Sequence, residues 1–198
     1  TALGELIANS SNVIIMGHRF ADLDCLGSAV GMLKAVKEAN KPAFICIDKE
    51  KNLVSLLLER LLSSGYTHDD FVMPDDAISQ VTKDTLLIVV DTHVPHVLES
   101  EKLYRKCKNV VVIDHHRKLV SYIDNAVIFY HEPYASSAAE MVAEIVQYLP
   151  HTPQMTKVEA EAMLAGITLD TKNFVMRTGV RTFEAAAYLR KLGADTLE

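Results

Sequence analysis

The sequence predicts an α/β fold: a mainly parallel, doubly wound sheet with flanking helices and a helical cluster at the C-terminal end. The first observation is a series of short, almost purely apolar runs rich in β-branched residues. Such runs are typical of parallel strands that are covered on both faces. The second is that helical patterns alternate with these runs, as they do in doubly wound sheets. The third is that the last third of the chain shows helical patterns with little strand between them.

The elements follow one another in a regular order. Strands are predicted at residues 12–16, 43–47, 85–90, 110–113 and 126–130. The helices predicted between them are residues 26–39, 53–62, 75–80 and 100–107. The C-terminal cluster is predicted to hold helices at 136–148, 157–169 and 181–192. Ser137-x-x-Glu140 and Thr156-x-x-Glu159 each fit a capping box at the start of such a helix.

Composition limits what the chain can be. Its 198 residues suffice for one sizeable domain, and 49% of them are hydrophobic. The net charge of −6 argues against a protein that binds long nucleic acid through a basic face. The three cysteines form no C-x-x-C pair, so we expect a reducing cytosolic compartment and small, buried core residues.

No apolar run is long enough to cross a bilayer, and no signal segment opens the chain. We therefore expect no membrane contact by this chain itself. Because the chain begins with threonine and its last residues look like the start of a connection, we expect it to be part of a longer protein.

Acidic and imidazole side chains stand directly after the predicted strands. His18-x-x-x-Asp22-x-Asp24 follows residues 12–16, Asp91 follows 85–90, and Asp114-His115-His116 follows 110–113. Asp170 also ends an apolar segment. Ligands of open α/β sheets bind beyond the carboxyl ends of the strands, which meet at one edge. The sequence therefore predicts that these groups gather in one place.

Such a cluster calls for cations, because carboxylates held close together repel one another. A single Asp after a strand is usually a turn or capping residue, but the combined pattern favours metal ligation. Mixed carboxylate and imidazole ligation suits Mn²⁺, Fe²⁺, Co²⁺ or Zn²⁺ better than Ca²⁺. Two such ions can share a hydroxide and hold a phosphoryl group during in-line attack. The prediction is a two-metal phosphoester hydrolase.

Other residues have two open interpretations. Arg117 could bind a phosphate or be a solvated arginine. Ser136 and Ser137 open a helix whose N-terminal amides could receive an anion, or they could simply cap it. His93 could support a ligand, face the substrate or do neither. The chain has no G-x-G-x-x-G or Walker-type loop, so nothing indicates an NAD enzyme or a P-loop NTPase.

Taken together, the motifs resemble those of the DHH phosphoesterase superfamily, from Asn12 to Asp195. The matching motifs are Gly17-His18-x-x-x-Asp22-x-Asp24, Asp91-Thr92-His93, Asp114-His115-His116-Arg117 and Gly166-Ile167-x-Leu169-Asp170-Thr171. The DHHR motif and the segment 132–140 are most similar to the DHH domain of the cyclic-di-AMP phosphodiesterases of Gram-positive bacteria. Those enzymes are membrane-anchored, which implies a place on the cytoplasmic side of the membrane as part of a larger protein.

The resemblance implies a role for each motif residue. One Mn²⁺ ion would be held by His18, Asp22 and Asp91, and the other by Asp24, Asp91, His115 and Asp170. Asp91 would bridge the two ions. His116 would contact the phosphate or protonate the leaving oxygen, and Asp114 would orient the histidines. His116, Asp91 and Asp114 are thus the predicted catalytic residues, with His116, Arg117, Ser136 and Ser137 at the substrate.

The activity implied is hydrolysis of cyclic-di-AMP to linear pApA by a metal-bridging hydroxide. The alternatives are an oligoribonuclease or pApA phosphatase of the same superfamily, a more distant manganese pyrophosphatase, and a non-catalytic nucleotide sensor. Family members carry a second, substrate-binding domain, DHHA1, with a G-G-G-H motif, whereas this chain has no adjacent glycines. Residues 1–198 are therefore expected to be the DHH catalytic domain without DHHA1, with weak or no activity when isolated. The sequence does not determine the oligomeric state, and a homodimer is one possible assembly.

Overall fold

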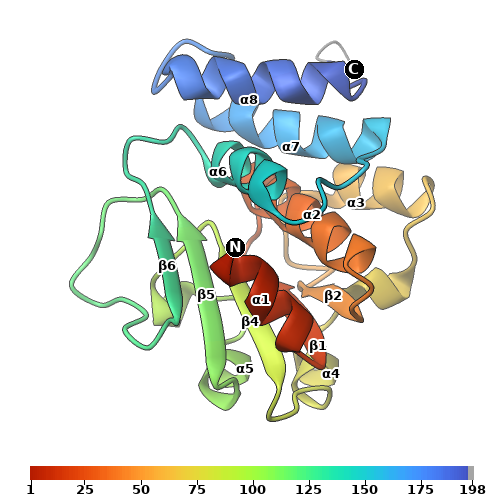
Figure 1. Cartoon of the computed structure of the whole chain (residues 1–198), viewed down its shortest axis with the longest axis vertical. Helices are drawn as coiled ribbons and strands as arrows, with labels where there is room; N and C mark the ends of the chain where they lie inside the picture. The colour runs from red at the N-terminus through yellow and green to blue at the C-terminus, as the bar shows by residue number, and fades with distance from the viewer. Residues whose placement is uncertain (196–198) are drawn as a thin grey trace.

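The structure, a computed structural model, describes residues 1–195 and contains a six-stranded sheet in the order β3-β2-β1-β4-β5-β6 (Figure 1). The strands are β1 (Asn12–Met16), β2 (Ala43–Cys46), β3 (Phe71–Val72), β4 (Thr85–Val90), β5 (Asn109–Asp114) and β6 (Ile128–His131). Every neighbouring pair is parallel, so the predicted fold class is confirmed. β3 was not predicted, because two residues carry no readable periodicity.

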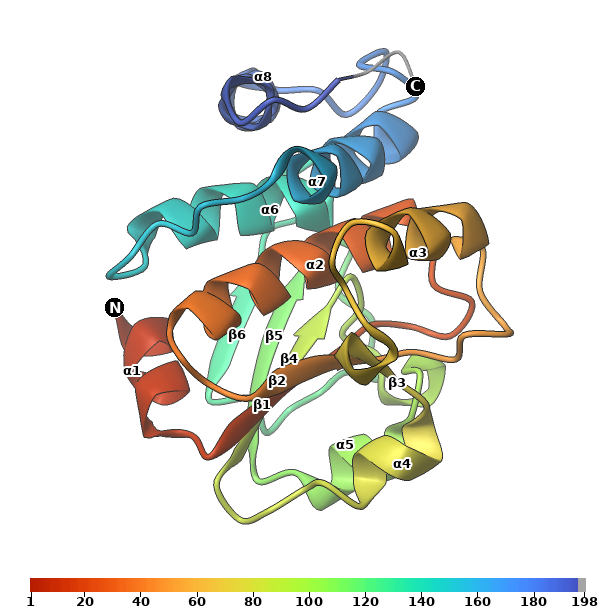
Figure 2. The same ribbon diagram turned by 90° about the vertical axis from the view of Figure 1, so that its right-hand side faces the viewer.

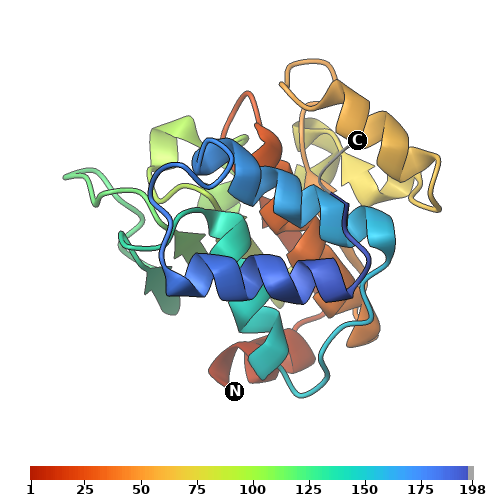
Figure 3. The same cartoon turned by 90° about the horizontal axis from the view of Figure 1, so that it is seen from above.

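Helices lie on both faces of the sheet. They are α1 (Ala2–Asn9), α2 (Leu23–Glu38), α3 (Ser55–Leu62), α4 (Pro74–Ile78), α5 (Glu101–Lys106), α6 (Ala138–Ile145), α7 (Lys157–Asp170) and α8 (Val180–Lys191), with short 3₁₀ turns η1 (His68–Asp70), η2 (Pro95–Val97) and η3 (Val146–Tyr148). Figure 2 shows α4 and α5 on one face and α2 on the other. α7 and α8 lie over α2 and α6, as the view from above shows (Figure 3). The predicted C-terminal helical cluster is confirmed.

The apolar strand runs arise from burial on both faces. In β1, Val13 and Ile15 face the side that α2 and α7 cover, while Ile14 and Met16 face the side of α4 and α5. Because successive side chains of a strand point to opposite faces, a strand covered twice must be apolar at every position. This burial explains why the sequence predicted the central strands well.

The N-terminal helix α1 was missed because its signal is short. Only Leu3 and Ile7 are buried, one turn apart. The helix start of α2 also differs from the prediction, since α2 begins at Leu23 and not at residue 26. Asp22 is its N-cap and accepts the amide hydrogen of Cys25. The first turn of α2 therefore carries two of the predicted metal ligands, Asp22 and Asp24.

The two predicted capping boxes differ in outcome. At α7, Thr156 and Glu159 make both bonds of the box. At α6, the hydroxyl of Ser137 accepts the amide hydrogen of Glu140 as predicted, but the Glu140 carboxylate accepts the amide of Ser136. The second half of that box is therefore displaced by one residue.

Helices α2 and α7 pack so closely that a glycine is required between them. A Cβ at Gly27 would lie 2.4 Å from the carbonyl oxygen of Ala162. We expect Gly27→Ala to lower the free energy of unfolding by about 1–3 kcal/mol, because backbone atoms must move apart. Urea unfolding would measure this effect. Gly179→Ala is the control, since its Cβ meets nothing within 4 Å, and equal stability of the two variants would contradict the prediction.

The cysteines and the lengths of the helices are ordinary for a globular domain. Cys25, Cys46 and Cys107 are free and buried, as expected of small core residues. Within residues 1–195, no helix combines the length and the apolar character needed to cross a membrane.

Candidate metal centre

The predicted ligands meet at the point where the strand order reverses. β1 and β4 are neighbours in the sheet, but the chain continues from β1 to β2 on one side and from β4 to β5 on the other. The connections that leave their carboxyl ends therefore run to opposite sides, and open α/β sheets bind ligands in the crevice at such a point. His18, Asp91 and Asp114 all line a cleft of about 1470 Å³ at this point.

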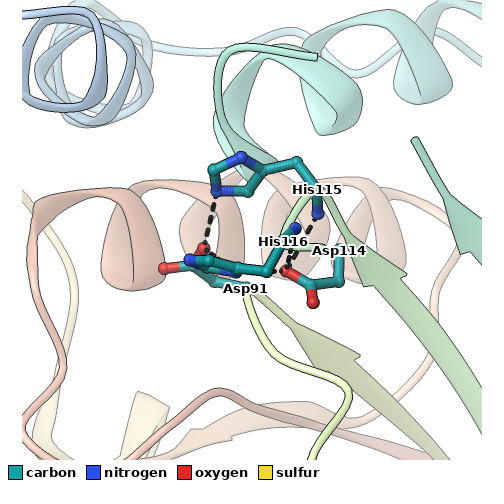
Figure 4. A group of neighbouring side chains, drawn as sticks. All are labelled: Asp91, Asp114, His115 and His116. Atoms are coloured by element: carbon teal, nitrogen blue, oxygen red, sulfur yellow. Dashed lines mark hydrogen bonds and ion pairs between the residues drawn. The ribbon is translucent and has the colours of Figure 1, made fainter. Parts of the chain in front are cut away.

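Asp91 lies at the centre of the cluster. Its Oδ2 atom is 3.2 Å from Nε2 of His18, and its Oδ1 atom is 3.3 Å from Nε2 of His115. The residue has a φ of +62°, and its amide hydrogen bonds to the carbonyl of Ile113 on β5. This left-handed turn directs the carboxylate between the two imidazoles. Figure 4 shows Asp91 beside the residues of the Asp-His-His motif.

His115 faces three carboxylates. Its Nε2 atom lies 3.2 Å from an oxygen of Asp170, 3.3 Å from Asp91 and 3.4 Å from Asp24. These four residues can each place one ligand atom within 4.8 Å of all the others. Asp24 is held rigidly, because the amides of Ala138 and Ala139 at the start of α6 donate to its two oxygens.

Two atoms of this cluster lack the bonds that buried polar atoms normally make. Within the part of the chain that the structure describes, Oδ1 of Asp91 and Nε2 of His115 have no hydrogen-bond partner, although both are buried. Buried polar atoms are rarely left unpaired. Here the two atoms lie 3.3 Å from each other but do not have the geometry of a hydrogen bond. Such an arrangement is expected of ligand atoms that surround a common point. The donor set therefore fits a divalent cation.

A second set of donors lies on the other side of Asp91. One atom each of His18, Cys25 and Asp91 lie within 4.8 Å of one another. The Nδ1–H of His18 donates to the Arg19 carbonyl at 2.8 Å, which leaves Nε2 free for a metal. Burial raises the pKa of the Cys25 thiol, which keeps it protonated and a poor ligand. The Oδ1 atom of Asp22, a carboxylate oxygen, lies 3.7 Å from Nε2 of His18.

The crowding of carboxylates shifts the pKa values of the cluster. Burial alone would lower the pKa of His115, but Asp170, Asp24 and Asp91 outweigh it and raise the value to about 12. Burial also disfavours charged His18, yet Asp22 and Asp91 raise its pKa to about 11. In the metal-free protein these imidazoles therefore hold protons at neutral pH and provide the positive charge that the carboxylates need.

Asp24 is harder to ionise because of its burial and of the carboxylates around it. Burial, and then the neighbouring charge of Asp91, raise its pKa to about 7. The pKa of Asp170 is also raised, first by burial and then by Asp24, although His115 lowers it. Carboxyl groups that are hard to ionise without a cation are typical of a site built to receive one.

Asp114 is a hub for the loop that follows β5. Its Oδ1 atom accepts bonds from the amide and Nδ1 of His116 and from the amide of His115, and its Oδ2 atom accepts from Nδ1 of His93 at 2.6 Å. Burial would raise its pKa, but the bonds from His116 and His93 hold the pKa far below its usual range. With both oxygens engaged, Asp114 positions the histidines.

His93 and His131 support this loop, a role that no pattern in the sequence settled. The amide of Leu119 donates to Nε2 of His93, which fixes the tautomer with a proton on Nδ1. That proton bonds Asp114, and His93 is buried beneath the loop. His131, at the end of β6, lies 2.5 Å from the carbonyl of His116.

The predicted substrate residues have different environments. Arg117 is exposed and lines the cleft with His116. Ser136 and Ser137 are fully buried, and Ser137 caps α6. The nearby amides of α6 that could have bound an anion already bind the carboxylate of Asp24. Ser137 thus caps the helix, as in the second of the two interpretations, and the hydroxyl of Ser136 lies 3.2 Å from that of Ser137.

The chain is similar in sequence to known phosphoesterases. The chain is 46% identical over 200 residues to the cyclic-di-AMP phosphodiesterase GdpP of Bacillus subtilis, and this match covers 99% of the chain but only 30% of that protein. It is 27% identical to the bifunctional oligoribonuclease and PAP phosphatase NrnA of Mycoplasma genitalium, over 96% of the chain and 56% of the relative.

An exopolyphosphatase-related protein from Bacteroides fragilis has the same fold, with a TM-score of 0.80 at 18% identity over 98% of this chain and 56% of the other. Residues 12–167 match the model of the DHH family, N-terminal domain. This match spans the strands and most of the motif residues that build the site. The chain belongs to the DHH family.

Proposed function

We propose that this chain is the catalytic domain of a metal-dependent phosphodiesterase that hydrolyses cyclic-di-AMP to linear pApA. The observation that carries the proposal is the position of Asp91, whose two carboxylate oxygens face two separate donor sets. A carboxylate shared in this way supports a two-metal site. The Bacillus relative, a cyclic-di-AMP phosphodiesterase, supports the choice of substrate.

The residues that would hold the ions form two groups. His18, Asp22 and Asp91 would hold one, and Asp24, Asp91, His115 and Asp170 the other. When bound, two Mn²⁺ ions would supply a shared hydroxide for attack on phosphorus and would neutralise charge on the phosphoryl oxygens.

His116 is the proposed acid. Its Nδ1 donates to Asp114 at 2.7 Å, and the ring is about half exposed in the cleft. The bond to Asp114 raises the pKa of His116, which favours the ring with protons on both nitrogens. Its Nε2–H can then protonate the 3′-oxygen as it leaves. Arg117, the next residue, would bind the same phosphate.

The deciding experiment is an assay with added Mn²⁺ on the natural full-length protein, because the chain spans only 30% of the Bacillus relative. Cyclic-di-AMP, pApA and pyrophosphate would be offered separately, and the products resolved by chromatography. We expect conversion of cyclic-di-AMP to pApA, with slow further cleavage. Metal binding without turnover of any phosphoester would favour a non-catalytic nucleotide sensor.

The second candidate is an oligoribonuclease or pApA phosphatase. The Mycoplasma relative, with matches along 96% of this chain, favours it. Cleavage of pApA to AMP with cyclic-di-AMP left intact would establish this function and exclude the first. Cleavage of pyrophosphate alone would exclude both.

The role of His93 gives a separate prediction. We expect His93→Leu to reduce turnover by about 10- to 100-fold, the usual cost of removing a residue that orients an active group. The reason is that Asp114 loses the bond that fixes it beneath His116. His93→Gln, which can still donate to Asp114, should recover part of the rate. Steady-state kinetics would test this, and wild-type turnover by His93→Leu would contradict it.

A further inference from the structure

The arginines of this chain differ in whether they have partners. Four of the seven pair with carboxylates: Arg60 with Glu161, Arg105 with Glu101, Arg181 with Glu132 and Glu144, and Arg190 with Asp195. Arg19 donates to the carbonyl of His96. Across residues 1–195, Arg117 and Arg177 have neither an ion pair nor a hydrogen bond for their guanidinium groups. Both line the same cleft as the metal centre.

Arg177 reaches the cleft from an unusual turn. Between α7 and α8, Lys172, Asn173, Phe174 and Arg177 have φ angles of +48°, +60°, +65° and +53°. Residues with a Cβ rarely adopt this left-handed conformation. The turn is held by Thr171, whose carbonyl accepts the amides of Val175 and Met176 and whose hydroxyl accepts that of Phe174. Backbone strain that is supported in this way is concentrated at functional sites.

The charge of the cleft explains what an unpaired arginine could do there. The metal centre brings together four ligand aspartates, Asp22, Asp24, Asp91 and Asp170, and two divalent ions would offset their charge only locally. A ligand with a second phosphate, away from the ions, needs another cation for that phosphate. The cleft, at about 1470 Å³, exceeds the usual size of a small-molecule pocket. Two exposed aromatic rings, Phe20 and Tyr134, also line it and could stack against bases.

We propose that Arg177 binds the phosphate that is not being cleaved, in a ligand with two phosphate groups, while Arg117 binds the phosphate at the metal centre. The identity of that ligand as a dinucleotide rests on the proposed function. In this proposal Arg177 binds ligand and selects for a second phosphate. The turn after α7 places its side chain at the cleft.

The test compares substrates with two phosphates and with one. In the full-length protein with Mn²⁺, Arg177→Gly should raise the KM for cyclic-di-AMP by about 10- to 100-fold, as expected for loss of a charge-assisted bond. The kcat for cyclic-di-AMP and the kinetics for bis(p-nitrophenyl) phosphate, which has one phosphate, should stay within about 3-fold. Arg177→Lys should recover part of the affinity. Arg105→Ala, which removes the same charge from α5, is the control.

The unfolding temperature of Arg177→Gly distinguishes a role in binding from a role in stabilising the fold. Glycine relieves the left-handed strain, so Arg177→Gly should unfold at the same or a higher temperature while it binds more weakly. An unchanged KM for cyclic-di-AMP, or an equal loss with both substrates, would overturn the proposal. If the wild-type protein does not cleave cyclic-di-AMP, the proposed function fails, and calorimetry with pApA decides the inference independently. Weaker binding of pApA by Arg177→Gly would support it, and equal binding would refute it.

Discussion

Replacing Asp91 with asparagine is expected to reduce Mn²⁺-dependent turnover by more than about 10³-fold. The reason is that one carboxylate serves both donor sets, so its loss affects both ions, whereas loss of an orienting residue usually costs about 10- to 100-fold. Asparagine is preferred to alanine because residue 91 has a φ of +62°, which asparagine tolerates. The measurement is steady-state hydrolysis by the full-length protein.

The same variant should lose stabilisation by metal. At an Mn²⁺ concentration 100 times the Kd, binding stabilises the folded state by about 2.7 kcal/mol, which for a domain of this size raises the melting temperature by roughly 5–11 °C. We expect this shift in the wild type and in Asp84→Asn, a control at an exposed aspartate. Asp91→Asn should show little of it. A full shift together with full turnover in Asp91→Asn would refute the bridging role.

Binding of Mn²⁺ is expected to release protons. At pH 7 the metal-free protein holds protons on His18, with a pKa of about 11, and on His115, with a pKa of about 12. Because metal ligands must be neutral imidazoles and ionised carboxylates, binding should release about two protons from these imidazoles and about half a proton from Asp24, whose pKa is about 7. The affinity should therefore rise steeply with pH. Calorimetry in buffers of different ionisation enthalpy would count the released protons. His115→Asn should release about one fewer, whereas His151→Asn, a change at an exposed loop residue, should not alter the count.

The metal-free protein should show the opposite dependence on pH. The folded-state pKa values of His18 and His115 lie above the unfolded value of 6.5, so their protonation stabilises the fold fully below pH 6.5. That contribution is lost as the pH rises towards 11–12. Thermal melts of the metal-free protein should therefore show declining stability at alkaline pH. Metal binding that releases no protons would contradict this account of the site.

The sequence was most informative where a single segment contains the whole signal. The central strands β1, β4 and β5 were predictable because burial on both faces makes each of them continuously apolar. β3 and α1 were missed, because two residues of strand and two buried positions of helix are too few to form a pattern. The start of α2 was placed three residues late, since a capping aspartate and a ligand aspartate look alike in sequence.

Short motifs likewise predicted which acidic and imidazole groups the site contains. His18 and Asp91 follow strands β1 and β4, and Asp114 ends β5; the parallel direction of these strands brings the three residues to one edge. The motifs did not show which other groups each residue contacts. The amides of α6 bind Asp24, so the helix N-terminus predicted as an anion site is occupied from within the protein.

The sequence by itself determined the fold class and the set of chemical groups at the sheet edge, because strand burial and motif spacing are local properties. Only the tertiary structure decided which groups lie together: that Asp91 faces both His18 and His115, and that His93 donates to Asp114. It also leaves the guanidinium of Arg177 without an ion pair or hydrogen bond within residues 1–195. The contacts of Asp91 join segments as far apart in the sequence as those after β1 and β5. No local pattern encodes such contacts, since they arise only when the packed helices and the sheet bring those segments together.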